Sequence, residues 1–180
     1  MACPDGLTLL VGGARSGKSD LAQRLAAESD VHVVFVATAE AGDDDMAERI
    51  ERHRRDRPTS WSTIEEPLDL AGVIAAVPPD VTVVIDCLTL WTANVLFGGL
   101  SSDDALERSE AAATQCSERG GRTIVVTNEV GSGLHPSTAL EREYRDLLGR
   151  VNAAWACQAD RTWLVVAGQV LPLQRVEELT

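Results

Sequence analysis

Short runs of apolar, largely β-branched residues alternate along the chain with longer segments of helical periodicity. The runs at 7–11, 31–38, 81–86, 122–129 and 161–168 predict strands, and a last run at 169–173 predicts an edge hairpin. The segments at 18–28, 43–57, 69–77, 90–97, 103–120 and 137–159 predict helices. Apolar strands separated by helices are typical of an α/β fold, in which helices cover both faces of a mostly parallel sheet.

Signals at the ends of these segments support the assignment. The segment 43–57 starts with acidic and ends with basic residues, which suits a helix dipole, and Pro58 ends it. Gly120 and Gly121 are predicted to cap the helix before them. Because carboxyl ends of parallel strands share one edge, the loops at 12–19, 37–43, 86–89 and 128–135 should meet there. No linker interrupts the pattern, so we expect one domain over residues 1–180.

Composition narrows the class of protein. The net charge of −12 argues against a sequence-independent nucleic-acid binder, although a few local cations suffice for a nucleotide. The apolar runs are too short for a membrane span, and no targeting segment is recognised, so we expect a cytoplasmic protein. The four cysteines have neither disulfide nor zinc spacing, which predicts free, buried thiols.

A phosphate-binding loop lies between the first predicted strand and helix. The eight residues fit G-x-x-x-x-G-K-[ST], and they are Gly12, Gly13, Ala14, Arg15, Ser16, Gly17, Lys18 and Ser19. Backbone N–H groups and the helix N-terminus would cradle the phosphates. Lys18 should reach the β- and γ-phosphates, and the Ser19 hydroxyl should bind Mg²⁺.

Asp86 follows the apolar run VTVVI, as the acidic residue of a Walker B strand does. We therefore expect Ser19 and Asp86 to be the metal ligands of a Mg²⁺-dependent nucleotide-using enzyme. The alternative is that Asp86 only caps a helix or a turn.

A histidine among arginines indicates a second kind of chemistry. In MAERIERHRRDRP, the residues Arg49, His53 and Arg57 share one face of the predicted helix, and Arg54 flanks them. Neutral imidazole is a nucleophile and arginines grip phosphates, but γ-phosphate transfer to an alcohol needs no covalent enzyme intermediate. The alternative is an ordinary solvated helix face with basic residues at its C-terminus. His32 is expected to be structural, and no role is specified for His135.

The order of several motifs resembles a known family. These motifs are GGARSGKS, VATAEAGDDDMAERIERHRRDRP, W-S-T-I-E-E-P, VVIDCLTLWTANVLF, VTNEVGSGLHPSTALEREYRDLLGRVNAAWA and ADRTWLVVAG. They span about residues 7–170 and are similar to the bifunctional adenosylcobinamide kinase / adenosylcobinamide-phosphate guanylyltransferases of cobalamin biosynthesis. The resemblance implies a RecA-like P-loop NTPase fold, a homotrimer, and adenosylcobinamide, its phosphate, GTP and ATP as substrates.

The family chemistry implied is phosphorylation of the aminopropanol hydroxyl of adenosylcobinamide, followed by GMP transfer from GTP through a GMP-histidine intermediate. His53 matches the nucleophile, and Arg52 stands where some relatives carry a second histidine. The resemblance also implies nucleotide contacts from the loop 12–19 and from Ala37, Thr38, Ala39, Arg54, Arg55, Asp56, Arg57, Glu65 and Asp86. Our own inference adds Asn128 and Glu129, at the end of a strand, as cleft residues that orient the substrate hydroxyl or a water; a structural turn is the alternative.

Other interpretations remain open from the sequence. The apolar residues of 90–97 are either an interface or, as their helical spacing more often indicates, core. A plain P-loop kinase would keep the phosphate loop and Asp86 but give His53 no chemistry. A nucleotide-dependent switch would hydrolyse slowly and would need no acceptor.

Overall fold

The computed structural model describes residues 6–28, 31–40, 42, 44–55, 57–133 and 135–179. Its strands form one seven-stranded sheet of order β3-β2-β4-β5-β1-β6-β7. All neighbouring strands are parallel except β6 and β7, which pair antiparallel. The strands are β1 (Leu7–Gly12), β2 (Val33–Ala37), β3 (Ser62–Glu65), β4 (Thr82–Asp86), β5 (Thr123–Asn128), β6 (Arg161–Val166) and β7 (Gln169–Leu173). The predicted mostly parallel sheet and edge hairpin are confirmed.

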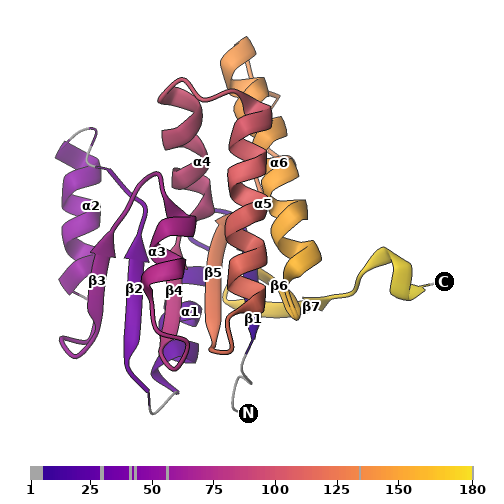
Figure 1. Cartoon of the computed structure of the whole chain (residues 1–180). Coiled ribbons are helices and arrows are strands. Elements are labelled where there is room, and N and C mark those ends of the chain that lie inside the picture. Colours follow the sequence, from indigo (N-terminus) through magenta and orange to yellow (C-terminus); the bar gives the residue numbers. More distant parts are fainter. Residues whose placement is uncertain are drawn as a thin grey trace.

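The helices cover the two faces unequally (Figure 1). They are α1 (Lys18–Ala27), α2 (Asp44–Arg55), α3 (Leu70–Ala76), α4 (Leu88–Phe97), α5 (Ser102–Glu118) and α6 (Ala139–Gln158), with a 3₁₀ turn η1 (Val176–Leu179) near the end. Helices α3 to α6 stack on one face, α1 lies behind the sheet, and α2 stands beside β3. Each face is therefore protected from water by helices, as a parallel sheet requires.

Two apolar clusters sit on either side of the sheet. The larger cluster joins alternate residues of β1, β2 and β4 to α3–α6 around the fully buried Trp91 and Trp155. The smaller cluster places Leu21 and Leu25 of α1 against the other set of strand residues, such as Phe35 and Val126. Because successive strand residues point to opposite faces, one apolar strand supplies both clusters. The rigid sheet that results fixes the loops at its carboxyl edge.

Three expectations need correction. The strand β3 was not predicted, because among its four residues only Ile64 is apolar, and the strand is held at the sheet edge by β2. Gly120 and Gly121 do not cap α5, whose last residue is Glu118 and whose C-cap is Arg119 in an extended conformation. Cys87 and Cys116 are buried free thiols as expected, but Cys157 is exposed.

No helix in the part of the chain that the structure describes is long and apolar enough to cross a membrane.

Candidate active site

A cleft of about 770 Å³ opens at the carboxyl edge of the sheet. It is bounded by the phosphate loop, by α2, and by the ends of β2, β4 and β5. Of the predicted site residues, twelve line it: Ala14, Arg15, Ser16, Gly17, Lys18, Ser19, Ala37, Ala39, His53, Arg57, Asp86 and Asn128. The fold thus brings together residues from five separate segments of the sequence, four of them at the strand ends that the carboxyl-edge rule predicts to meet.

The phosphate loop turns sharply between β1 and α1. Arg15 and Gly17 both adopt positive φ, 56° and 98°, which a glycine tolerates at Gly17 without strain. The buried Lys18 ammonium donates to the Gly13 carbonyl at 2.7 Å, so it folds back over the loop. The α1 N-terminus has no side-chain cap. Free N–H groups at a helix start are what an anionic phosphate needs.

Asp86 ends β4 opposite the loop. Burial raises the pKa of its carboxyl, while the hydrogen bond from the Ser19 hydroxyl and the electrostatic influence of the neighbouring His53 and Lys18 side chains act in the opposite direction. The interactions show that the carboxylate of Asp86 lies within reach of both the phosphate loop and α2. A half-buried acid surrounded by cations and a hydroxyl is a suitable oxygen donor for a hard metal ion.

Helix α2 carries His53, whose half-buried side chain lines the cleft. Arg57, just beyond the helix, is 9% exposed. Burial lowers its pKa, and the charge of Asp86 opposes that shift. Arg54 and Glu65, in contrast to His53 and Arg57, do not line the cleft. They form an exposed ion pair with each other.

Several other predicted residues lie around the cleft rather than in its wall. Gly12 and Gly13 precede the lining part of the phosphate loop, and Arg55 is exposed and donates to the Glu51 carbonyl of its own helix. Asp56 lies outside the described residues, as does the side chain of Arg49. The shared face of Arg49, His53 and Arg57 therefore stays a prediction.

Thr38 lies behind the cleft wall, between Ala37 and Ala39, which line it. Its hydroxyl donates to the Cys87 carbonyl at 2.7 Å and accepts from the Cys87 N–H at 2.8 Å. Asn94 of α4 donates to the Thr38 carbonyl at 2.7 Å. Thr38 thus fastens the end of β2 to the residue that follows Asp86.

Asn128 ends β5, the strand between the phosphate-loop strand and the Asp86 strand. Its backbone N–H donates to the Thr89 hydroxyl at 2.7 Å, and its carbonyl accepts from Asn152 at 3.0 Å. With its backbone held on both sides, the side chain lines the cleft.

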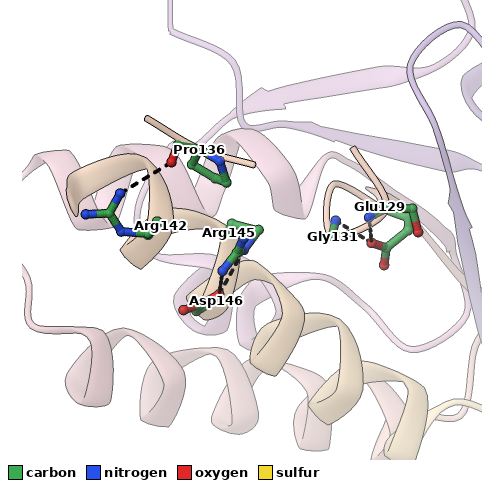
Figure 2. Close-up of polar contacts among 7 residues, drawn as sticks. Glu129, Gly131, Pro136, Arg142, Arg145 and Asp146 are labelled. Carbon is green, nitrogen blue, oxygen red and sulfur yellow. Dashed lines mark hydrogen bonds and ion pairs between the residues drawn. The ribbon is translucent and has the colours of Figure 1, made fainter. Parts of the chain in front are cut away.

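Glu129 behaves differently from its neighbour. Figure 2 shows its carboxylate folded back onto the turn that follows, where it accepts from the backbone N–H of Gly131. A second N–H, from Ser132, donates to the same oxygen at 3.3 Å. These contacts favour the alternative of a structural turn for Glu129.

Residues that sequence reasoning missed complete the wall. They are Asp20, Phe35, Glu48, Ile50, Arg52, Cys87, Leu90 and Val126. Most are apolar, and although several stand inside the quoted motifs, their residue types gave no sign that they line a cleft. Glu48 and Arg52 had a usable signal, because a spacing of four on α2 places them together; they form an exposed ion pair at 3.2 Å.

The apolar cluster of α4 is mostly core. Trp91, Val95 and Leu96 are buried, and Leu90 packs against the smaller cluster. Phe97 alone is strongly exposed, at 62%, and its ring lies 6.1 Å from that of Tyr144.

Comparison with known proteins adds a family to this geometry. Residues 8–173 match the family described as cobinamide kinase / cobinamide phosphate guanyltransferase. A bifunctional adenosylcobalamin biosynthesis protein of Pseudomonas aeruginosa is 44% identical over 92% of this chain and 96% of its own length. A protein of the same description from Escherichia coli K12 is 40% identical over 90% of this chain and 96% of its own length.

A solved structure from Pyrococcus horikoshii OT3 is similar in fold, with a TM-score of 0.59 over 95% of this chain and 87% of that one, at 5% identity. The mostly parallel sheet, the flanking helices and the G-x-x-x-x-G-K-S loop are those of a P-loop NTPase fold. The extent of the family match, together with identities of 44% and 40% over nearly the whole chain, shows that this protein belongs to the cobinamide kinase / cobinamide phosphate guanyltransferase family.

Proposed function

We propose that this protein phosphorylates the aminopropanol hydroxyl of adenosylcobinamide, with ATP or GTP as donor, and then transfers GMP from GTP to the new phosphate. The products are adenosylcobinamide-GDP and pyrophosphate. The single observation that carries the proposal is that one cleft is lined by Lys18, Asp86 and His53. A kinase accounts for the first two residues, whereas a nucleophilic imidazole beside a phosphate loop accounts for guanylyl transfer.

The second reaction proceeds in two displacements. A ring nitrogen of His53 attacks the α-phosphorus of GTP, so that a P–N bond forms, the bond to the bridging oxygen breaks and pyrophosphate leaves. A phosphate oxygen of adenosylcobinamide phosphate then attacks the same phosphorus, and the P–N bond breaks. Lys18 and the backbone N–H groups of the phosphate loop balance the negative charge that grows on the leaving pyrophosphate.

Ser19 and Asp86 are the residues that would hold Mg²⁺. Their oxygens are hydrogen-bonded to each other, and Mg²⁺ commonly takes only one or two protein oxygens beside phosphate oxygens and waters. Within the described ranges, no group of three or more His, Cys, Asp or Glu is placed to hold a metal by itself. These two donors fit a Mg²⁺ ion that binds together with the nucleotide. When bound, the ion would neutralise part of the phosphate charge.

We also propose that the chain acts as a single catalytic domain, because its strands join in one sheet. A homotrimer is proposed from the family resemblance alone, and a cytoplasmic location from the cysteine pattern, which indicates free thiols. Light scattering on the purified protein at micromolar concentration measures the oligomer directly.

Product analysis tests the proposed function. The wild type, given adenosylcobinamide, ATP, GTP and Mg²⁺, is expected to form first the phosphate and then the GDP derivative. His53→Ala should stop at the phosphate, and Lys18→Ala should lose both products, with a rate loss of about 10²-fold or more. A wild type that forms only the phosphate would reduce the function to that of a kinase. Nucleotide turnover that adenosylcobinamide does not change would indicate a switch protein instead.

A further inference from the structure

We propose that Arg57 is a positioning residue for His53, and that its guanidinium fixes the nucleophile through the protein rather than by gripping the nucleotide. The inference rests on the proposed function and names a device within the same site. It differs from the nucleotide contact that the family resemblance implies for this arginine.

Three contacts define the position of Arg57. Its Nε donates to the backbone carbonyl of His53 at 2.9 Å, so it binds the nucleophile's own residue. One terminal nitrogen donates to the Thr63 hydroxyl at 3.0 Å. The guanidinium carbon lies 4.1 Å from the centre of the Phe35 ring.

The two anchors belong to the rigid sheet. Phe35 on β2 and Thr63 on β3 are paired directly across the two strands, so one guanidinium spans adjacent positions of the sheet. Phe35 is a buried member of the smaller apolar cluster. Arg57 therefore connects the last turn of α2, which carries His53, to two fixed points.

The need for such an anchor follows from the helix. Where the structure describes them, its side chains are mostly polar and exposed, and none of these described α2 residues belongs to either apolar cluster. A helix with little apolar burial has little else to hold its position. In-line attack on phosphorus is sensitive to placement, and an error of about 1 Å can cost about 10²-fold in rate.

The chemistry of arginine suits this task and that of lysine does not. The planar guanidinium stacks on an aromatic ring while its fork donates in two directions. Lysine is a point charge that still serves as a phosphate binder. Arg57→Lys therefore separates the two roles, because it keeps the charge but loses the stacking and the fork.

The test is the rate of GMP–enzyme formation from GTP and Mg²⁺, measured by rapid quench over a range of GTP concentrations. The maximal rate of Arg57→Lys is expected to fall about 10²-fold, with half-saturating GTP changed by about twofold or less. Phosphorylation of adenosylcobinamide by ATP, measured on the same variant, should fall much less than GMP–enzyme formation, because His53 takes no part in it. Thr63→Val, which removes one anchor, should slow GMP–enzyme formation about fivefold.

Arg150→Lys is the matched control, because Arg150 is an exposed arginine of α6 paired with Asp103 at 2.9 Å. It should leave both rates unchanged. A cooperative thermal unfolding transition confirms that each variant is folded. If Arg57→Lys does not fold, Thr63→Val still tests the anchor.

Two results for Arg57→Lys would make Arg57 a phosphate contact and overturn the inference. One is a higher half-saturating GTP concentration with an unchanged maximal rate of GMP–enzyme formation. The other is an equal loss of rate in phosphorylation by ATP. A maximal rate in Arg57→Lys equal to that of the wild type would also overturn it. A wild type that forms no GMP adduct would overturn the proposed function itself, and this inference with it.

Discussion

Replacing Thr38 with valine removes a hydroxyl whose only described partners are backbone groups of Cys87. Valine matches threonine in shape, so the change deletes two hydrogen bonds without opening a cavity. The site is fully buried, at 0% exposed, and water cannot replace the lost partner. The effect should therefore appear in stability, although the resemblance to the family implies a nucleotide contact at this position.

The magnitude follows from the two bonds separately. The Cys87 N–H has no other partner among the described contacts, and an orphaned buried donor costs about 1–3 kcal/mol. The Cys87 carbonyl also accepts from the Trp91 N–H at 3.2 Å, so losing its hydrogen bond from the Thr38 hydroxyl costs only about 1 kcal/mol. Thr38→Val should lower the free energy of unfolding by about 2–4 kcal/mol in total. Thr38→Ser keeps the hydroxyl and loses one buried methyl, at about 1 kcal/mol.

Urea unfolding followed by tryptophan fluorescence measures the difference, because Trp91 and Trp155 are buried. With a slope of about 2 kcal/mol/M, the midpoint of Thr38→Val should fall by about 1–2 M at an unchanged slope. The serine variant should lie much nearer the wild type. If the valine variant is as stable as the serine variant, the hydroxyl does not fasten β2 to β4, and the reasoning fails.

Two further predictions concern stability. Within the capping box of α6, the Glu141 carboxylate accepts hydrogen bonds, first from the Thr138 backbone, and these hold its pKa below the ordinary 4.5. The charge of Glu141 therefore stabilises the fold fully above pH 4.5, and this contribution is lost as the pH falls through the lower folded-state pKa. The difference in urea midpoint between wild type and Glu141→Gln should shrink as the pH is lowered, and a constant difference would contradict this. A side chain at Gly121 would overlap the Pro79 carbonyl, whereas Gly120 has open space, so Gly121→Ala should lower the melting temperature by several degrees more than Gly120→Ala, and equal shifts would contradict it.

The sequence predicted those parts of the site that are determined locally. The phosphate loop is a contiguous motif, and its strand–turn–helix context can be recognised from periodicity. Asp86 could be placed in the cleft because an apolar strand ends at it and because strand ends meet at one edge. The edge hairpin after Val166 could likewise be predicted from the short apolar run at 169–173.

The rest depends on contacts between distant segments. The strand β3 has too little apolar character to be recognised, and it exists because β2 offers it an edge. Thr38 and Ala37 are neighbours in the sequence, yet only the fold shows that Thr38 bonds to Cys87 rather than facing the cleft. Gly121 looked like a helix cap, whereas close approach of the Pro79 backbone is what requires a glycine there.

The most direct test of the central claim is intact-mass spectrometry of the wild type and His53→Ala after incubation with GTP and Mg²⁺. We expect an acid-labile increase equal to one GMP in the wild type and none in the variant. Binding of GTP without any adduct in the wild type would contradict the claim that His53 is a nucleophile and leave a P-loop kinase. An adduct that persists in His53→Ala would place the nucleophile elsewhere.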